Sequence, residues 1–524
     1  MASICVVSYH PSLAALLADG EFRALAGREG FLIELRLDQY AGLMLEAFRS
    51  AVQALGPARL VVTFRAPEEG GAAAGVTDER RGEFLAAAVT AGSAFVDAEL
   101  RGLQRRGALF TALSKAPGLH AATKLVVSFH DFGGTPAADE LRKLRREAEE
   151  AGADIVKLAV TTKTSAETLP LAELLREEHP WTKPLLALGM GEAGFWTRVL
   201  GPLFPHAAPF TYARGEGAPG TAPGQPTWRE LEELYRFRQI RPEWPVYGVI
   251  GNPIAHSLSP LLHNTALATL GLEGVYLPFK VEGDPLAFVR DLAPKLGLRG
   301  ISVTLPHKEA VLPGCSTVDA LARQIGAANT LVRRETGAWH ASNTDAQAAA
   351  ESLELALGGA GALRGRTVLI LGAGGAARAV AFGVKARGAT VWLYNRTRER
   401  AEKLAHAVAG RCVLREELSR KEFRVDAVVN TTPLGMHPNI GLAPLEESEL
   451  PRCGILFDTI YNPLRTRLVR MAEGRGFQTL DGLTMFVGQG VAQFEHFTGR
   501  AAPRASMETA VRNALERRTQ AGAS

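Results

Sequence analysis

The sequence predicts an α/β protein that begins with a (β/α)8 barrel and continues with two smaller α/β units. Its 524 residues are too many for one hydrophobic core and favour roughly three domains. Up to about residue 238, short β-branched runs alternate with longer amphipathic segments, which is typical of βα units on a parallel sheet. The alternation resumes after a Pro- and Trp-bearing stretch, Arg241 to Pro245, where we expect an extended linker.

Eight strand candidates lie in the first part of the chain, and eight is the number that a (β/α)8 barrel needs. They lie at Ile4, Leu32, Leu60, Phe95, Leu125, Ile155, Leu185 and Phe210. We therefore assign residues 1–238 to the barrel and residues 239–245 to the linker.

Two further α/β units are expected after the linker. Their strands are predicted at Val246 to Ile250, Val275 to Phe279, Ile301 to Leu305, Thr367 to Leu371 and Ala389 to Tyr394. The first unit spans residues 246–345 and is completed by helices in 482–516; the second, a Rossmann domain, spans residues 346–481. The small polar tail, 517–524, is expected to be disordered.

Composition limits the classes of function. The net charge of +4 is spread without long basic or acidic runs, so neither a nucleic-acid nor a membrane partner is expected. The four cysteines form no CxxC pair and lie near no histidines at ligand spacing, which favours a reducing compartment and no metal. Without a signal peptide or a membrane-spanning run, the chain is expected to be cytoplasmic. We expect a monomer or weak homodimer that acts on small molecules.

Polar side chains are concentrated at the carboxyl ends of the predicted barrel strands, where different strands can meet one ligand. They are Glu34, Arg36, Arg65, Glu69, His130 and Lys157. An amine, an imidazole and several arginines at one barrel mouth are suited to chemistry on an anionic keto compound.

Lys157 is the most informative of these residues because it lies inside an apolar strand. Burying an ammonium group is costly unless its pKa falls or a partner neutralises it, and a lowered pKa is what an imine-forming amine requires. Alone, Lys157 could equally be a snorkelling side chain or half of a structural ion pair, and His130 a satisfied strand-end histidine. Their convergence on one mouth favours catalysis.

Five ordered blocks resemble type I 3-dehydroquinate dehydratase. They are Glu34-Leu-Arg36-Leu-Asp38, Thr63-Phe-Arg65-Ala-Pro-Glu-Glu69-Gly-Gly71, Ser128-Phe-His130-Asp-Phe132, Ala153-Asp-Ile-Val-Lys157-Leu-Ala159 and Ala222-Pro-Gly-Gln225. The resemblance implies that Lys157 forms a Schiff base with the substrate ketone, that His130 moves protons and that Glu69 orients the imidazole. It also implies a set of substrate-binding residues: Glu34, Arg36, Arg65, Arg198, Gln225 and Thr221, where the family commonly has serine.

A glycine-rich motif marks a dinucleotide site. Gly372, Gly374 and Ala377 follow a predicted strand and precede a predicted helix, which is the context that the fingerprint requires. The glycines let the backbone approach a pyrophosphate held by the helix N-terminus. The next strand ends without an acidic residue, and Arg396 and Arg400 are suited to a 2′-phosphate, which favours NADP. Arg398 is interpreted as an ordinary solvated arginine.

The unit between the barrel and the Rossmann domain carries hydroxyl, amide and charged residues in short motifs. They are Gly251-Asn-Pro-Ile-Ala-His-Ser257-Leu-Ser259-Pro260, Val303-Thr304-Leu-Pro-His-Lys308, Gly326-Ala-Ala-Asn329-Thr330 and Ser342-Asn343-Thr-Asp345. Alone, Lys308 would be a surface lysine and the serines loop or cap residues. Beside a dinucleotide domain, they supply donors for a carboxylate and a Lys-Asp pair for proton transfer at a carbonyl.

These motifs, with Asn430-Thr-Thr-Pro-Leu-Gly-Met436, Tyr461-Asn-Pro463 and Gly488-Gln489-Gly490, resemble shikimate dehydrogenase from about residue 246 to 515. The resemblance implies that Lys308 and Asp345 form the catalytic pair. It implies substrate contacts by Ser257, Ser259, Thr304, Asn329, Tyr461 and Gln489. It implies cofactor contacts by Gly372, Ala373, Gly374, Gly375, Ala376, Asn395, Arg396, Thr397, Arg400, Thr431, Met485 and Gly488.

The two resemblances imply consecutive reactions, because the product of the first, 3-dehydroshikimate, is the substrate of the second. Fusion would raise the local concentration of this intermediate. Two alternatives stay open: an enzyme of the same architecture that oxidises quinate with NAD, and a ligand sensor without catalysis. Comparing the two acids and the two cofactors would separate the first, and retention of Lys157, His130, Lys308 and Asp345 argues against the second.

Overall fold

The computed structural model describes residues 2–40, 42–73, 75–220, 222–437 and 439–521, and the chain divides into two compact units. Unit 1 comprises Met1–Val246, Pro253–Ala255 and Leu277–Leu298, and unit 2 comprises Tyr247–Asn252, His256–Tyr276 and Arg299–Ser524. Two short segments beyond the expected linker therefore group with unit 1. The division is not a single cut between residues 238 and 246.

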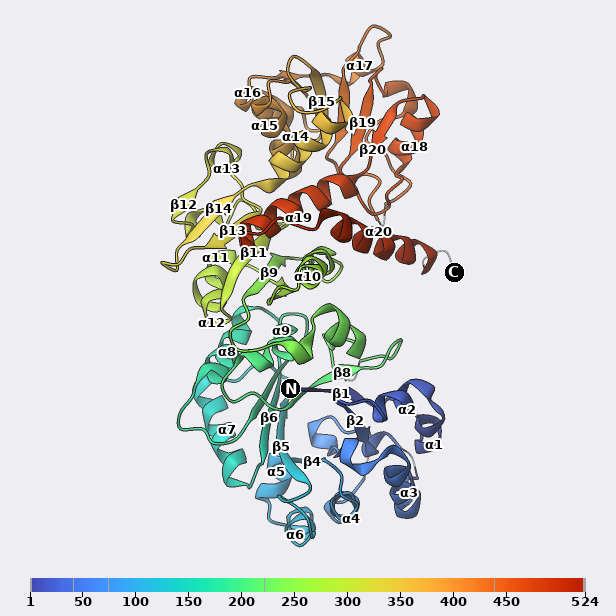
Figure 1. Ribbon diagram of the computed structural model, residues 1–524, viewed down its shortest axis with the longest axis vertical. Helices are drawn as coiled ribbons and strands as arrows, with labels where there is room; N and C mark the ends of the chain where they lie inside the picture. The colour runs from blue at the N-terminus through green and yellow to red at the C-terminus, as the bar shows by residue number, and fades with distance from the viewer. Residues whose placement is uncertain (1, 41, 74, 221, 438, 522–524) are drawn as a thin grey trace. The chain divides into compact units, whose positions relative to one another are not determined.

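Eight parallel strands form the barrel of unit 1 (Figure 1). They are β1 (Ser3–Val7), β2 (Phe31–Arg36), β3 (Leu60–Thr63), β4 (Phe95–Glu99), β5 (Lys124–Asp131), β6 (Ile155–Thr161), β7 (Leu185–Met190) and β8 (Phe210–Arg214). Their order is β7-β6-β5-β4-β3-β2-β1-β8. The ring closes where Leu185 pairs with Ala207, just before β8. The predicted (β/α)8 barrel and all eight of its strands are confirmed.

Helices cover the outside of this barrel. They are α1 (Leu13–Ala18), α2 (Gly20–Ala26), α3 (Leu45–Leu55), α4 (Asp78–Thr90), α5 (Leu100–Gln104), α6 (Ala108–Ser114), α7 (Ala138–Glu150), α8 (Leu169–Arg176) and α9 (Trp196–Val199). Unit 1 also contains α11 (Pro285–Ala287) and α12 (Ala293–Lys295), which belong to the segment Leu277–Leu298. In α7 the apolar Leu141, Leu144 and Ala148 form one buried face and charged residues fill most of the other. Because helices cover their outer faces, the strands are mostly apolar and almost wholly buried.

The segment expected to be an extended linker makes a turn instead. The amide of Trp244 donates to the carbonyl of Arg241 at 3.0 Å. Pro242 occupies the second position of this turn, where its fixed φ is favoured. Trp244 is buried, with the Arg236 guanidinium 4.9 Å from its ring centroid. The expectation of an extended linker is therefore wrong, because the tryptophan side chain is drawn into the apolar interior.

A mixed sheet follows the barrel, with strand order β10-β9-β11-β13-β14-β12. Its strands are β9 (Val246–Gly251), β10 (Val275–Lys280), β11 (Leu298–Val303), β12 (Thr317–Val318), β13 (Thr330–Arg333) and β14 (Trp339–Ser342), and its helices in unit 2 are α10 (Ser259–Thr269) and α13 (Ala320–Ile325). β13 and β14 form an antiparallel hairpin, where we expected continued βα alternation. The tight turn at Gly337, with φ of +84°, allows this hairpin.

The last sheet is wholly parallel, with order β17-β16-β15-β18-β19-β20. Its strands are β15 (Thr367–Leu371), β16 (Thr390–Tyr394), β17 (Arg411–Cys412), β18 (Ala427–Asn430), β19 (Ile455–Asp458) and β20 (Gln478–Leu480). Its helices are α14 (Thr344–Ala356), α15 (Gly375–Ala386), α16 (Arg398–Ala407), α17 (Arg415–Leu418) and α18 (Arg467–Gly474). Numbered from β15, this is the 3-2-1-4-5-6 order of the predicted Rossmann domain.

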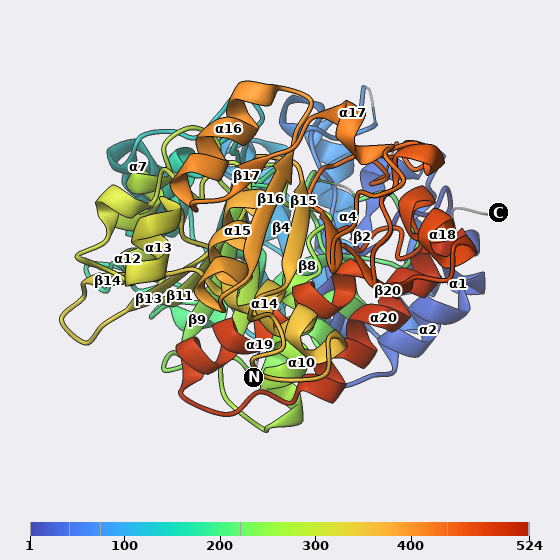
Figure 2. The same ribbon diagram turned by 90° about the horizontal axis from the view of Figure 1, so that it is seen from above.

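Helices cover both faces of the Rossmann sheet. Helices α15 and α16 cover one face and α18 the other (Figure 2). The sheet order reverses between β15 and β18, so a crevice opens at the carboxyl ends of these two strands.

The chain ends in two long helices, α19 (Gly482–Thr498) and α20 (Arg504–Ala521). Helix α19 packs against α14, and α20 packs against α10. The disorder expected from Arg517 onward is wrong as far as Ala521, because the arginine, glutamine and alanine of this stretch favour continuation of the helix. The rest of the expected tail, 522–524, lies outside the described residues.

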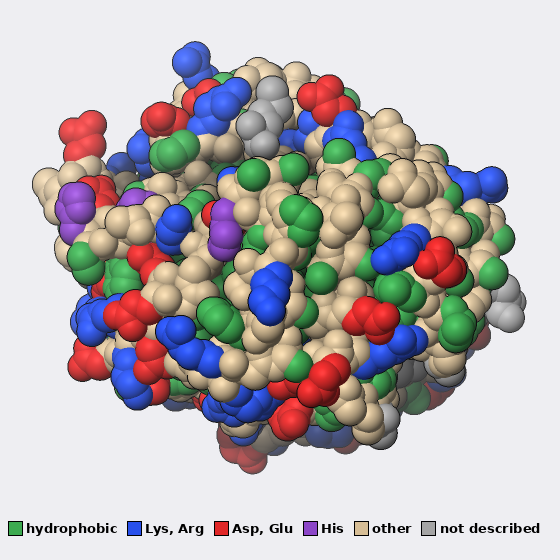
Figure 3. All heavy atoms as spheres, turned by 90° about the horizontal axis from the view of Figure 1, so that it is seen from below, with side chains coloured by type: hydrophobic (Ala, Val, Ile, Leu, Met, Phe, Trp, Pro, Cys, Tyr) green, Lys and Arg blue, Asp and Glu red, His purple; other side chains and the backbone are tan. Residues whose placement is uncertain are grey.

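The surface carries charges of both signs. On the face shown in Figure 3, basic and acidic side chains are interspersed among apolar ones. Across the described ranges, no helix is both long and apolar enough to cross a bilayer. The same ranges contain no group of three or more His, Cys, Asp or Glu side chains placed to hold a metal ion.

Candidate active sites

Lys157 lies inside the barrel and is almost wholly buried, at 5% exposure. Its Nζ donates to Asp97 Oδ2 at 2.9 Å and to the Tyr212 hydroxyl at 3.3 Å, and it lies 4.3 Å from the centroid of the Tyr212 ring. The buried cation therefore has a carboxylate partner on β4. A buried ammonium group needs either a lowered pKa or a partner of opposite charge. The structure supplies the partner.

A buried network surrounds this ion pair. Arg65, just after β3, donates to Ser128 Oγ at 2.7 Å and to Asp97 Oδ2 at 3.1 Å. Ser128 in turn donates to Asp97 Oδ1 at 2.6 Å. Burial opposes ionisation of Asp97, but Arg65 and Lys157 outweigh it and hold the pKa of this carboxyl well below its usual range. Asp97 is therefore a fixed negative charge that positions the amine.

His130, on β5 next to the strand of Lys157, is paired with Glu69. Its Nδ1 lies 3.0 Å from Glu69 Oε2, which also accepts from the His130 amide at 3.1 Å. Burial, with Arg65 and Lys157 nearby, lowers the pKa of His130 well below its ordinary value. Burial also raises the pKa of Glu69 to about 7. A neutral imidazole with Nδ1 directed at a carboxylate leaves Nε2 as the proton acceptor.

The other expected substrate-binding residues of the barrel lie at the same strand ends. Glu34 accepts from Thr63 Oγ1 at 2.7 Å, and Arg36 makes a two-pronged ion pair with Asp38 at 2.9 and 2.8 Å. Arg198, on α9 after β7, is 2% exposed. Burial lowers its pKa to about 10, and within the described part of the chain its Nε has no hydrogen-bond partner. A buried guanidinium in this state is suited to an anionic ligand.

The segment after β8 holds Gln225, which is buried. Its backbone carbonyl accepts from Arg214 Nε at 3.2 Å, and the nearby Pro223 carbonyl accepts from the Gly191 amide at 3.0 Å. These bonds fix the segment at the ends of β7 and β8. Thr221 lies outside the described residues.

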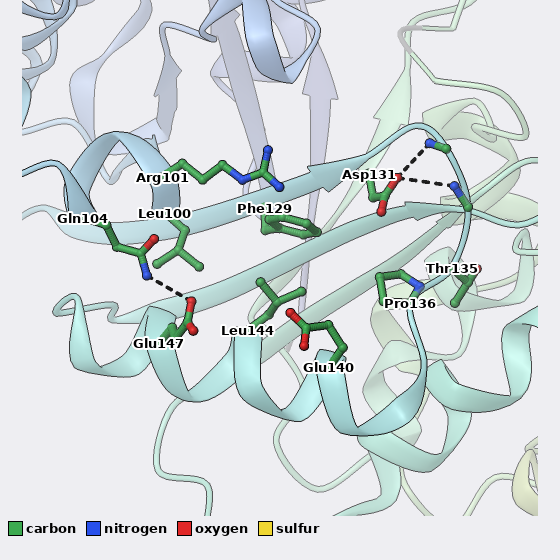
Figure 4. A pocket seen from close by; sticks show the side chains of 12 residues that line it. Leu100, Arg101, Gln104, Phe129, Asp131, Thr135, Pro136, Glu140, Leu144 and Glu147 are labelled. Atoms are coloured by element: carbon green, nitrogen blue, oxygen red, sulfur yellow. Dashed lines mark hydrogen bonds between the residues drawn. The ribbon is translucent and has the colours of Figure 1, made fainter.

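A hollow of about 570 Å³ lies elsewhere on unit 1, between α5, α7 and β5 (Figure 4). Its floor includes Phe129, whose ring lies under the Arg101 guanidinium, and one end is closed by the Gln104–Glu147 hydrogen bond. At the other end, Asp131 accepts from two glycine amides. None of the predicted site residues lines this hollow, so it is separate from the site at the barrel mouth.

In unit 2, Lys308 and Asp345 form the expected pair. Lys308 Nζ donates to Asp345 Oδ2 at 2.6 Å, and both side chains retain partial exposure. Asp345 lies in the first turn of α14, where the helix dipole stabilises a negative charge. The geometry is suited to delivery of a proton from the ammonium group.

Asn329 links this pair to α19. Its Nδ2 donates to Thr344 Oγ1 at 2.9 Å and to Gln489 Oε1 at 3.4 Å. The adjacent Ala328 amide donates to the Lys308 carbonyl at 2.8 Å. Lys308, Asn329, Asp345 and Gln489 are thus brought together.

The expected hydroxyl donors lie at the ends of β9 and β11. The Ser259 amide donates to Ser257 Oγ at 3.3 Å. The Thr304 amide donates to the Ile250 carbonyl of β9 at 3.0 Å, and β11 ends at Val303, two residues before the strand end expected at Leu305. Among the described residues, no hydrogen bond joins either serine to Lys308.

The glycine-rich turn has the expected form. Gly372 has a φ of +113°, and a Cβ there would lie 2.6 Å from Thr431 Oγ1. A Cβ at Gly374 or Gly375 would meet nothing within 4 Å, so the backbone at the start of α15 is open to a ligand. Ala373 and Ala376 complete this turn. A phosphate-bearing cofactor fits these residues because the free amides of a helix start face the opening.

The loop between β16 and α16 and the first turn of α16 carry exposed cations. Arg396 and Arg400 are exposed and, among the described residues, make no ion pair. Arg398 is instead paired with Glu402 at 2.7 Å. Asn395 Nδ2 donates to the Thr397 carbonyl at 2.8 Å and so shapes the turn. The interpretation of Arg398 as a solvated helix residue agrees with this ion pair.

Three further expected residues lie on or beside α19. The Tyr461 ring stacks on Phe486 with centroids 4.7 Å apart. Met485 is buried in the hydrophobic core of the Rossmann domain, and a Cβ at Gly488 would lie 3.2 Å from Ala348 Cβ. Close packing of α19 on α14 therefore accounts for the glycine.

The sequence interpretation missed Asp97 and Gln493, and it named Ser128 in a family motif without giving it a role. Asp97 carries a signal of its own, since it is a charged side chain inside a buried barrel strand, as Lys157 is. Gln493, one helical turn beyond Gln489, donates to the Asn329 carbonyl at 2.9 Å and accepts from Ser302. No local pattern distinguishes it from a surface glutamine.

Four family models match the chain. Type I 3-dehydroquinase matches residues 4–242, and the shikimate dehydrogenase substrate binding domain matches residues 249–331. Shikimate / quinate 5-dehydrogenase matches residues 354–438, and the shikimate 5'-dehydrogenase C-terminal domain matches residues 482–512.

Known proteins are similar to the whole chain and to about half of it. The chain is 36% identical over 490 residues to the chloroplastic bifunctional 3-dehydroquinate dehydratase/shikimate dehydrogenase of Arabidopsis thaliana, covering 90% of this chain and 78% of that protein. It is 39% identical over 280 residues to the shikimate dehydrogenase (NADP(+)) of Methanothermobacter thermautotrophicus, covering 52% of this chain and 97% of that one.

Solved structures are similar as well. The shikimate 5-dehydrogenase of Thermus thermophilus, in complex with NADP(H) and shikimate, is 36% identical with a TM-score of 0.47, covering 52% of this chain and 99% of that one. The dehydroquinate dehydratase and shikimate dehydrogenase from S. pombe is 25% identical with a TM-score of 0.45, covering 97% and 98%.

Proposed function

This chain belongs to the family of bifunctional 3-dehydroquinate dehydratase/shikimate dehydrogenases, and on that premise we propose how its own residues carry out the two reactions. The chain dehydrates 3-dehydroquinate to 3-dehydroshikimate and reduces 3-dehydroshikimate to shikimate with NADPH. The observation that carries the residue assignment is the pairing of the buried amine of Lys157 with Asp97, next to the His130–Glu69 pair.

Lys157 is the residue that condenses with the substrate ketone. Its ammonium group loses a proton, Nζ attacks the carbonyl carbon, and water leaves as the imine forms. Asp97 holds Nζ in place and balances the charge of the protonated imine, and Arg65, which donates to the same carboxylate, keeps Asp97 in position. The positive imine nitrogen then draws electrons from the neighbouring carbon, which makes its proton removable.

His130 removes that proton through Nε2. The lowered pKa keeps the imidazole neutral and able to accept, and Glu69 stabilises the imidazolium that results. The enamine then expels the hydroxyl group, which takes the proton from His130 and leaves as water. A second water hydrolyses the imine, so that Lys157 is regenerated and one water is lost overall.

The remaining polar side chains of the barrel mouth bind the substrate. Arg198 binds the carboxylate, because it is a buried cation for which no ion pair is found among the described residues. The ring hydroxyls are bound by Glu34, Arg36, Arg65, Gln225 and Thr221.

In unit 2, Lys308 gives a proton to the carbonyl oxygen as it is reduced, and Asp345 keeps the ammonium group aligned. When bound, NADPH supplies the hydride. The substrate is held by Ser257, Ser259, Thr304, Asn329, Tyr461 and Gln489. Both serine hydroxyls are present, which favours shikimate over quinate as the alcohol.

The cofactor is held at the Rossmann crevice. The turn Gly372 to Ala376 and the N-terminus of α15 bind the pyrophosphate, and Arg396 and Arg400 pair with the 2′-phosphate. Asn395, Thr397 and Thr431 line the same edge. Met485 and Gly488 lie at the nicotinamide end of the site. Their helix, α19, supports the site through its packing against α14.

We also propose the division into a dehydratase barrel (1–238), a substrate-binding domain (246–345 with 482–516) and a Rossmann domain (346–481). The cytoplasmic location and the monomer or weak homodimer stay predictions. All four cysteines are free, which supports a reducing compartment.

Trapping with borohydride tests the role of Lys157. The chain is treated with sodium borohydride with and without 3-dehydroquinate, digested and analysed by mass spectrometry. We expect an adduct of the reduced ligand on the peptide that contains Lys157, and only when ligand is present. An unmodified Lys157 in a preparation that still dehydrates the substrate would exclude the Schiff base. A ligand sensor would give neither turnover nor adduct.

A further inference from the structure

Arg378 connects the cofactor-binding helix to the substrate-binding unit. It lies on α15, one turn after the glycine-rich motif, and its Nε donates to the carbonyl of Ile325 at 2.8 Å. Its Nη2 contacts the same oxygen. Two donors of one guanidinium therefore converge on a single backbone carbonyl in the other domain of unit 2.

The position of this arginine is unfavourable for its own helix. A cation in the first turn is repelled by the positive end of the helix dipole. Glycine and alanine occupy the rest of this turn. The contact with Ile325 offsets the cost, because the last carbonyls of α13 have no partner within their own helix.

The segment that Arg378 holds, Ile325 to Asn329, leads directly to the substrate site. The Ala327 carbonyl accepts from Asn343 Nδ2 at 2.9 Å, and the Ala328 amide donates to the Lys308 carbonyl at 2.8 Å. A displacement of Ile325 would therefore move both Asn329 and Lys308.

Tight packing makes this connection stiff. Ile325, Ala327, Ala346 and Ala379 form one buried cluster from three elements. A Cβ added at Gly383 would lie 2.3 Å from the Ala346 carbonyl oxygen, so α15 lies directly on the start of α14, next to Asp345. Small residues at these positions leave little space for one element to shift without the other.

We propose that Arg378 is a positioning residue that couples cofactor binding at the start of α15 to substrate binding at Asn329 and Lys308. The inference rests on the proposed function of unit 2. It adds a connection by which a ligand on one domain strengthens binding on the other. Arg378 contacts neither ligand in this role and acts through the backbone of Ile325 to Asn329.

Equilibrium titration of the full chain with shikimate tests this coupling. Dissociation constants are measured without cofactor and with saturating NADPH, a combination in which both ligands are reduced and no turnover occurs. Coupling between sites is typically about 5- to 150-fold, and we expect shikimate to bind the wild-type chain at least about fivefold more tightly with NADPH. In Arg378→Gln the ratio should fall below about twofold. Arg378→Lys, which keeps the charge but loses the two-donor geometry, should be intermediate.

Arg387→Gln is the matched control. Arg387 follows the last residue of α15 and pairs with Glu354 on α14 at 2.7 Å, so its loss also removes an ion pair but leaves Ile325 untouched. It should keep the wild-type ratio. Dehydratase activity, measured in the same preparations, should be unchanged and reports that each variant is folded.

Several results would overturn the coupling. The wild-type chain could bind shikimate equally well with and without NADPH. The Arg378→Gln variant could keep the wild-type ratio of affinities, or it could lose the same affinity for shikimate in both titrations so that the ratio is unchanged. A wild-type chain that neither binds shikimate nor reduces 3-dehydroshikimate would instead contradict the proposed function.

Discussion

Single side chains at the barrel mouth have properties that depend on partners from other strands. Lys157 lies in β6, but its charge is balanced by Asp97 from β4. The sequence identified the lysine because a cation inside an apolar run is unusual. It did not identify the partner, because 60 residues separate the two in the chain and only the closed barrel brings them together.

Glu69 gives the dehydratase a predicted pH dependence. Its pKa, raised by burial to about 7, means that lowering the pH through this value protonates the carboxylate that supports His130. His130 itself stays neutral over this range because its pKa is lowered. We therefore expect kcat/KM for dehydration to fall as the pH drops through about 7.

Glu69→Gln should remove this inflection. It should also lower kcat/KM at least about tenfold, a fraction of the 10²–10⁴ typical of general acid–base catalysis. Glu68→Gln, at an exposed neighbouring position, is the control and should leave the profile unchanged. A Glu69→Gln profile with the wild-type inflection would mean that another group titrates.

At the scale of elements, the turn between β16 and α16 illustrates how a short motif becomes a binding surface. The strand ends without an acidic residue, and the chain then exposes Arg396 and Arg400 while Arg398 is engaged by Glu402. The helical spacing of Arg398 and Glu402, four residues apart, produces this difference between neighbouring arginines.

Arg396→Ala should weaken NADPH selectively. Loss of a charge-assisted hydrogen bond of about 1.5–3 kcal/mol corresponds to about a 10- to 150-fold rise in the dissociation constant for NADPH. Binding of NADH, which lacks the 2′-phosphate, should change less than about twofold. Arg398→Ala is the matched control and should affect neither cofactor. Fluorescence titration of both cofactors measures these effects, and equal weakening of both would contradict the 2′-phosphate assignment.

At the scale of the whole molecule, the two activities belong to units with separate hydrophobic cores. A change in one site should therefore leave the other working, since well-separated positions act almost independently.

Lys157→Ala tests this independence. Dehydration should fall by more than about 1,000-fold, as is typical when a covalent nucleophile is removed. Reduction of 3-dehydroshikimate by the same preparation should stay within about twofold of wild type. Lys163→Ala, at an exposed lysine just after β6, should change neither rate. Loss of both activities in a folded Lys157→Ala chain would show that the units depend on each other.

The sequence by itself determined the eight barrel strands, the Rossmann turn and most of the residues that carry chemistry. Short stretches of sequence carry the signals for these properties: the period of apolar residues, the glycines of a tight turn and charged residues at strand ends. It failed where distant segments decide the outcome, as at Trp244, which turns the linker inward, and at β13–β14, which pair antiparallel.

Only the tertiary structure decided which groups pair. Asp97 with Lys157 and Arg378 with the Ile325 carbonyl each join different elements. Such contacts depend on how the elements close and pack in space, and burial then sets the charge state of each group. The sequence therefore supplied the reactive side chains, and the fold determined their partners and their protonation.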